Sequence, residues 1–154
     1  MTIHGKWYQW FVVAATIAVL CDIAITDLRT FKIYNSRVLL LLSLYGVFAA
    51  VSRSPYEVLS DIALGLIIFG FLFLFYLKNV VGGGDVKLVP VAALFVGTHS
   101  AFPFAVLLLA FTGLHLFATR MDWVPTLAVD NKRAISYAPS IAAALICIIV
   151  LDFL

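Results

Sequence analysis

The sequence has little charge for its length. Asp, Glu, Lys and Arg make up only 12% of its 154 residues, against about a quarter in an average soluble domain. The net charge of +2 is too small for binding nucleic acid through its phosphates. The same composition excludes an intrinsically disordered chain and a coiled coil. A soluble fold is excluded too, because so short a chain cannot bury this much apolar surface in its own core.

Cysteine and histidine are also scarce. Cys21 and Cys147 lie inside apolar runs, where a cysteine behaves as a small buried hydrophobe rather than half of a disulfide or metal pair. His4, His99 and His115 are scattered without the spacing of metal ligands. We therefore predict no metal site and no other cofactor.

Apolar residues, by contrast, make up 64% of the chain and gather in six runs. The runs cover about residues 7–26, 38–51, 58–77, 86–97, 101–119 and 138–154, and the fourth is short. A transmembrane helix needs about 20 such residues. The pattern predicts an all-α, polytopic membrane protein with about six transmembrane helices in one domain and no separate soluble domain. The first run is too long for a signal peptide's apolar region, so we expect it to be retained.

The basic residues predict the orientation in the membrane. The first, third and fifth connections hold eight of the ten: Arg29, Lys32, Arg37, Lys78, Lys87, Arg120, Lys132 and Arg133. The opposite side has only Lys6 and Arg53. Since cytoplasmic loops of membrane proteins are enriched in Lys and Arg, these three connections are predicted to be cytoplasmic and both termini to face out.

Asp85 follows a run of three glycines, Gly82, Gly83 and Gly84, in the third connection. Each glycine costs a helix interior about 1 kcal/mol relative to alanine, but it permits positive φ and close backbone approach. Irregular backbone at membrane depth is tolerated where protein or water satisfies it. We expect a loop that presents Asp85 to water and substrate; the alternative is that Asp85 caps the next helix.

Asp27 reaches the same predicted membrane face at the end of the first span. The alternative interpretation is a solvated acid balanced by the nearby Arg29 and Lys32. Asp22 lies about one turn deeper and points elsewhere, so we expect it to bond to another helix or to line the same cavity. Two carboxyls that share a site do not both ionise easily, which permits aspartic-protease chemistry and a bell-shaped pH profile. Paired acids in a membrane also serve as proton or cation relays.

Three segments resemble motifs of the type IV prepilin peptidases. Residues 82–88, GGGDVKL, resemble the family's G-x-G-D-x-K-L motif. Residues 27–35, DLRTFKIYN, resemble its first motif, with Tyr34 in place of the usual Pro and Asn35 at the end. Residues 136–139, SYAP, resemble its P-Y-x-x-A-I stretch, with Ser136 in place of the first Pro.

The resemblance implies an aspartic endopeptidase of the prokaryotic cytoplasmic membrane that removes a short basic leader from pilin-like precursors at the cytoplasmic face. Asp27 and Asp85 would be the catalytic acids. The residues expected to shape the loop or to contact substrate and lipid headgroups are Gly82, Gly83, Gly84, Lys87, Arg29 and Asn35. For Lys87, we favour headgroup anchoring.

Larger members of this family also methylate the new N-terminus and carry a cysteine-containing cytoplasmic domain. This sequence resembles the short form found with tight-adherence (Flp-type) pilus systems, which implies a peptidase without methyltransferase activity. The alternative functions are a small proton- or ion-coupled transporter subunit, in which the same carboxyls bind an ion, and an inactive assembly partner. A transporter would be expected to show an internal repeat, and none is visible in the sequence.

Overall fold

The computed structural model describes residues 6–121, 127–129, 132–134 and 136–153. His4 and the end of the sixth predicted span at residue 154 lie outside these residues. Within them the chain forms six helices, and each coincides with one of the six predicted apolar runs. They are α1 (Lys6–Thr30), α2 (Asn35–Ser52), α3 (Pro55–Leu77), α4 (Gly83–Val96), α5 (Ala101–Arg120) and α6 (Ala138–Phe153).

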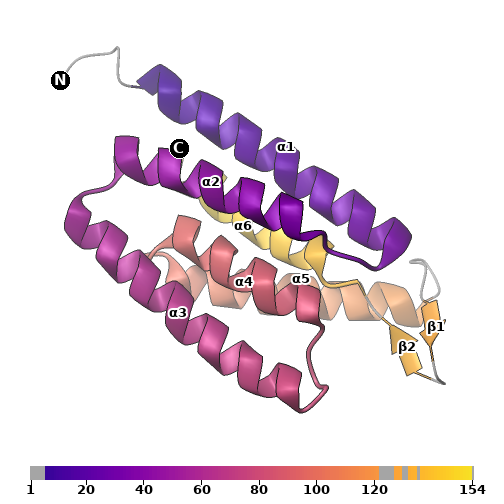
Figure 1. Ribbon diagram of the computed structural model, residues 1–154. Coiled ribbons are helices and arrows are strands. Elements are labelled where there is room, and N and C mark those ends of the chain that lie inside the picture. Colours follow the sequence, from indigo (N-terminus) through magenta and orange to yellow (C-terminus); the bar gives the residue numbers. More distant parts are fainter. Residues whose placement is uncertain (1–5, 122–126, 130–131, 135, 154) are drawn as a thin grey trace.

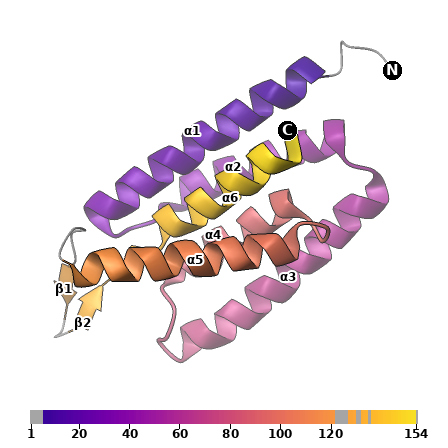
Figure 2. The same ribbon diagram turned by 180° about the vertical axis from the view of Figure 1, so that it is seen from behind.

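Successive helices run in alternating directions (Figures 1 and 2). The α1–α2, α3–α4 and α5–α6 connections therefore lie at one end of the bundle, and the α2–α3 and α4–α5 connections lie at the other. The predicted orientation in the membrane requires the first, third and fifth connections to lie on the same side, as they do here. Four helices, α1, α2, α3 and α5, are long and apolar enough to cross a membrane, while α4 and α6 are shorter.

A short hairpin that the sequence analysis did not predict lies in the α5–α6 connection (Figure 1). Strands β1 (Leu127–Val129) and β2 (Lys132–Ala134) pair antiparallel, with Leu127 opposite Ala134. The rest of the described fold is α-helical. The hairpin lies at the end of the bundle where α1 ends and α4 begins.

Helix α4 forms the centre of the bundle. Nearly all of its residues from Val86 to Val96 are buried, and it packs against α2, α3, α5 and α6. The contact with α3 is close at Gly65 of that helix, where a side chain would meet Leu94 and the Pro90 carbonyl of α4. With 14 residues, α4 is about 21 Å long, which is shorter than the ~30 Å hydrocarbon core. Its burial indicates that α4 is surrounded mainly by other helices rather than by lipid.

The outer helices α3 and α5 expose large apolar side chains, among them Leu66, Phe71 and Leu109. Continuous apolar surface of this kind is unfavourable in water and marks contact with a membrane or a partner. The bundle is therefore built as a membrane-embedded protein, with its most apolar faces outward.

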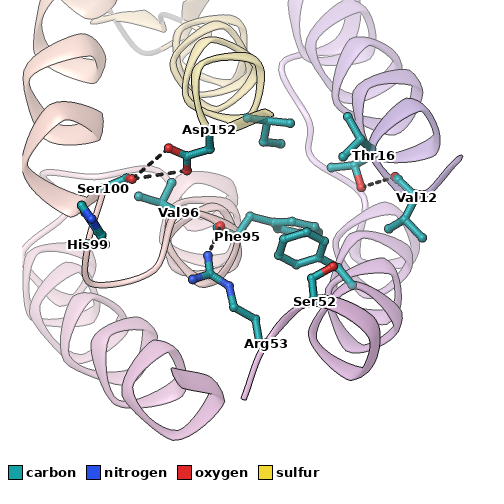
Figure 3. A pocket seen from close by; sticks show the side chains of 12 residues that line it. Val12, Thr16, Ser52, Arg53, Phe95, Val96, His99, Ser100 and Asp152 are labelled. Atoms are coloured by element: carbon teal, nitrogen blue, oxygen red, sulfur yellow. Dashed lines mark hydrogen bonds between the residues drawn. The ribbon is translucent and has the colours of Figure 1, made fainter. Parts of the chain in front are cut away.

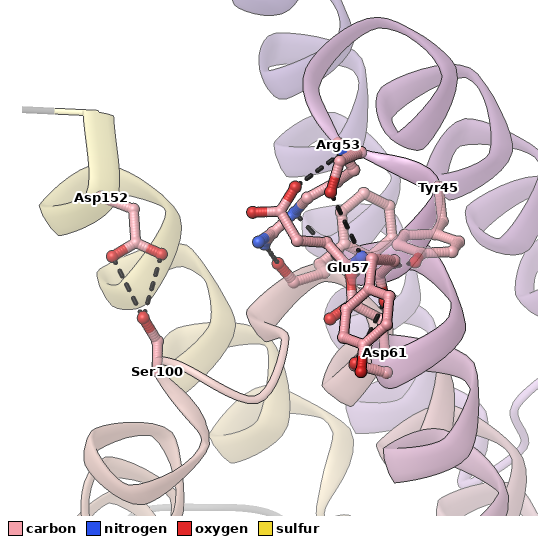
Figure 4. Close-up of polar contacts among 10 residues, drawn as sticks. Tyr45, Arg53, Glu57, Asp61, Ser100 and Asp152 are labelled. Carbon is pink, nitrogen blue, oxygen red and sulfur yellow. Dashed lines mark hydrogen bonds and ion pairs between the residues drawn. The ribbon is translucent and has the colours of Figure 1, made fainter.

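A buried polar cluster closes the end of the bundle at the α2–α3 connection (Figure 4). Tyr45 Oη donates a hydrogen bond to Asp61 Oδ2 at 3.1 Å, and Arg53 Nε lies 3.7 Å from the same oxygen. Arg53 also donates to the Phe95 carbonyl. Gly97, with φ of 68°, turns the chain just past α4. Asp61 is thus a structural acid that fixes three helix ends.

Beside this cluster is a cavity of about 290 Å³ between α1, α2, α4 and α6 (Figure 3). Arg53 and Asp152 lie on its walls, and Ser100 Oγ donates to the Asp152 carboxylate. The cavity lies near the ends of α2, α4 and α6, whereas Asp27 is near the end of α1 and Asp85 at the start of α4, at the opposite end of the bundle (Figure 1).

Candidate active site

Asp27 is buried near the end of α1, with 5% of its surface exposed. Its Oδ2 atom accepts hydrogen bonds from Ser136 Oγ at 2.5 Å and from the Ala138 backbone N–H at 3.2 Å. Ala138 is the first residue of α6, so its N–H has no partner within that helix. The carboxylate therefore binds the start of α6, where the helix dipole also favours negative charge.

Asp85 lies in the first turn of α4, just before the apolar residues that fill the bundle core. The N-cap position of this helix is Gly82, and no side chain makes a cap hydrogen bond there. The alternative prediction, that Asp85 is the helix cap, is therefore wrong.

Both acids line one cavity of about 700 Å³. Its walls come from the α1–α2 connection, the glycine segment and the residue before α6. They are Asp27, Phe31, Lys32, Ile33, Tyr34, Asn35, Val80, Gly82, Gly83, Gly84, Asp85 and Tyr137. The structure thus brings together residues from all three of the segments that carry the family resemblance.

Burial, and after it the negative charge of Asp27, raise the pKa of Asp85 to about 7. Desolvation disfavours the charged form, and a like charge nearby adds to that effect. Asp85 can therefore keep its proton near neutral pH. Asp27 differs from Asp85 in that two protein donors, Ser136 Oγ and the Ala138 N–H, bind its carboxyl.

Gly83 and Gly84 allow neighbouring side chains to pack closely against the start of α4. A Cβ atom on Gly84 would lie 3.0 Å from the Ile33 side chain, and one on Gly83 would lie 3.2 Å from Tyr76. None of the three glycines has positive φ, because Gly83 and Gly84 are helical and Gly82 has φ of −67°, so the irregular segment ends at Gly82. The close backbone approach that glycine was also expected to permit is confirmed. The glycines let α4 begin against the segment that follows Asp27.

The other polar residues predicted near the site differ in whether they contact the cavity. Lys87 Nζ donates to Asn35 Oδ1 at 2.9 Å, which joins α4 to α2 beside the cavity. Arg29 is exposed near the end of α1 and is not on the cavity wall. Asp22 forms an ion pair with Arg37 of α2. The prediction that Asp22 bonds to another helix is confirmed, and the alternative that it lines the cavity is wrong.

An apolar groove of about 200 Å³ adjoins the cavity and shares Val80, Asp85 and Tyr137 with it. Its other walls are Leu72, Val81, Val89, Leu108, Thr112 and Ile141. Asp85 therefore lies where a cavity with charged side chains on its wall meets a more apolar groove. In the part of the chain that the structure describes, no three His, Cys, Asp or Glu side chains are grouped as metal ligands.

Sequence reasoning missed Ser136 as a contact of Asp27 and Tyr137 as a wall of both spaces. Their motif was noted, but no local pattern links Ser136 to an acid at the other end of the chain. Only the packing of α1 against α6 brings them together.

A family model described as the type IV leader peptidase family matches residues 14–118. The match covers well over half of the chain and includes both Asp27 and Asp85. No curated protein and no solved structure matches significantly.

Proposed function

The chain belongs to the type IV leader peptidase family, and from this membership we propose that it is an aspartic endopeptidase in which Asp27 and Asp85 activate water. The observation that carries the proposal is their place on one cavity, where Asp85 has a raised pKa and Asp27 is held by hydrogen bonds. This arrangement supplies a base and an acid without a covalent intermediate.

In the proposed reaction, the Asp27 carboxylate removes a proton from a water molecule whose oxygen attacks the carbonyl carbon of the scissile peptide bond. Protonated Asp85 donates to the carbonyl oxygen as it becomes tetrahedral. The proton taken up by Asp27 then passes to the leaving nitrogen, and the C–N bond breaks. Asp85 recovers its proton when the new carboxyl group forms.

The substrate that fits this site is a pilin-like precursor with a short basic leader next to a hydrophobic helix. The cavity that carries the carboxyls of Asp27 and Asp85 would hold the basic leader, and the apolar groove would hold the first residues of the hydrophobic segment. Asp85, on the boundary between them, would then face the bond that joins the two parts. The acids on one wall and the apolar groove beside them support the substrate class that the family implies.

We place the site at the cytoplasmic face of a prokaryotic cytoplasmic membrane, with six spans and both termini outside. The support is the excess of Lys and Arg at the end of the bundle that carries Asp27 and Asp85. Basic residues there would also contact anionic lipid headgroups. We further propose peptidase activity alone, because the connections between the helices are short and leave no room for an inserted methyltransferase domain.

The test is to co-express a pilin-like precursor with the wild-type chain and with Asp27→Asn and Asp85→Asn variants. Each substitution keeps the side-chain shape but removes the ionisable group. We expect wild type to remove the leader and each variant to lose at least about a thousandfold in rate. Asp22→Asn is the matched control, since Asp22 is also an acid of α1 but pairs with Arg37 away from the cavity. Full-rate cleavage by either active-site variant would falsify the assignment.

A further inference from the structure

The two hydrogen bonds to Asp27 converge on one oxygen. Ser136 Oγ and the Ala138 N–H both donate to Oδ2, and both contacts are buried. Oδ1 accepts no hydrogen bond from the described residues, yet it is not among their buried and unsatisfied polar atoms. Since Asp27 lines the large cavity, Oδ1 is the oxygen left open to it.

We propose that Ser136 is a positioning residue that fixes Asp27 so that Oδ1 faces the attacking water, an inference that rests on the proposed peptidase function. A carboxylate on its own rotates about its last torsion, so the plane of its two oxygens takes many orientations because that torsion is broad. Two donors on one oxygen stop this rotation. The reacting oxygen is then oriented before substrate arrives, and such orientation in advance lowers the activation barrier.

The contact is suited to this role by its strength and its surroundings. Hydrogen bonds to an ionised carboxylate are short and stronger than neutral ones, and 2.5 Å is at the short end of that class. Ser136 is 3% exposed, so water does not compete effectively for the bond. The Ala138 N–H alone would leave Oδ2 with one donor at 3.2 Å.

The hydroxyl is also a feature of this chain rather than of the motif it resembles. The P-Y-x-x-A-I stretch has Pro where this sequence has Ser136, and Pro carries no donor in its side chain. The motif therefore does not explain the contact; the packing of α1 against α6 does.

The experiment compares Ser136→Ala, Ser136→Thr and Ser140→Ala in the full chain, purified in lipid vesicles, with a pilin-like precursor as substrate. Ser140 is the matched control, because it is also a buried serine, in the first turn of α6 rather than just before that helix, and it donates to the Phe111 carbonyl. We expect Ser136→Ala to lower kcat about tenfold, the loss of one charge-assisted hydrogen bond, with KM within about twofold of wild type. Ser136→Thr, which keeps the hydroxyl, should restore most of kcat.

A readout that does not need cleavage separates this inference from the proposed function. Carbodiimide modification of Asp27, measured by mass spectrometry, should be several times faster in Ser136→Ala than in Ser140→Ala, because the carboxyl loses the donor that covers Oδ2. Equal modification rates, or equal losses of kcat in the two alanine variants, would overturn the positioning role. If the wild-type chain does not cleave the precursor but Asp27 is still protected by Ser136, the proposed function fails and the contact stands.

Discussion

Lys87 Nζ donates a hydrogen bond to Asn35 Oδ1 across 2.9 Å, joining the start of α4 to the first residue of α2. A second contact lies beside it, where a Cβ atom on Gly84 would lie 3.0 Å from the Ile33 side chain. Together they hold the segment after Asp27 against the helix turn that carries Asp85. The two motifs that supply the acids are therefore fixed to each other, not merely brought to the same end of the bundle.

Replacing Lys87 with Met should loosen this junction while preserving side-chain length. We expect a loss of about 1 kcal/mol in the free energy of unfolding, as for other interhelical hydrogen bonds in membrane proteins, and a several-fold fall in cleavage rate. Thermal unfolding in detergent and precursor cleavage measure the two effects. Arg29→Met is the control, since Arg29 is equally basic and also exposed but has no hydrogen bond to α4 among the described residues. If both variants behave alike, Lys87 acts only through headgroup contacts or topology.

The apolar groove beside Asp85 can be tested by filling it. Leu108 lies on its wall, and a Trp there would occupy much of a space of about 200 Å³. We expect Leu108→Trp to lower kcat/KM for a full precursor by about tenfold, mainly through KM, because it removes binding common to ground and transition states. Leu109→Trp is the matched control, since Leu109 is 75% exposed on the outside of α5. Unchanged kcat/KM in Leu108→Trp would place the hydrophobic segment elsewhere.

The polar cluster at the other end of the bundle should affect stability without changing the chemistry. Tyr45→Phe removes the hydrogen bond to Asp61 and should cost about 1 kcal/mol. Gly97→Ala should cost more, because φ is 68° and the new Cβ would lie 2.8 Å from Asp61 Oδ1. Unfolding in detergent measures the loss, and kcat of the folded fraction should stay within about twofold of wild type. A large change in kcat with normal stability would show that this end communicates with the site.

The sequence predicted the helices well because long apolar runs leave the backbone few alternatives in lipid. It also identified the two acids that share the cavity, through the glycine run before Asp85 and the motif after Asp27. The sequence did not show why the run before Asp85 consists of glycines, since both positive φ and close packing favour glycine. The packing of Gly84 on Ile33 decides between them.

Contacts between distant segments were beyond sequence reasoning. The sequence around Asp61 does not predict that Tyr45 and Arg53 will bind its carboxyl in the bundle. Likewise, Ser136 appeared only as a departure from a motif, whereas in the structure it donates to Asp27. Such pairs depend on which helix faces pack together, and helices that are apolar all round give no clear periodic signal for this.

The proposed orientation predicts which connections a membrane-impermeant maleimide can reach in intact cells. In a chain with Cys21→Ala and Cys147→Ala, Thr98→Cys lies in the α4–α5 connection and should be labelled, because that connection is proposed to face out. Lys78→Cys, at the end of α3, should be labelled only after the membrane is permeabilised. Both positions are exposed in the bundle, so burial in the protein does not explain a difference. The reverse pattern would put Asp27 and Asp85 on the outer side.

The raised pKa of Asp85 predicts how the rate depends on pH. Burial is its larger cause and the Asp27 charge the smaller, and together they bring the pKa to about 7. A carboxyl with a raised pKa is protonated below that value and loses its proton as the pH rises through it. Because the proposed mechanism needs the protonated form of Asp85, the cleavage rate should fall as the pH rises through about 7.

Asp27→Asn separates the two causes. It removes the like charge but leaves Asp85 buried, so the pKa of Asp85 should fall yet stay above its ordinary value of 3.8. The infrared carbonyl band of protonated Asp85, assigned by its loss in Asp85→Asn, follows this titration without requiring activity. A band that titrates at the same pH in wild type and Asp27→Asn would mean that the two acids do not interact. A wild-type rate that rises through neutral pH to a plateau would show that Asp85 is not the acid, since a group that must be protonated cannot gain from losing its proton.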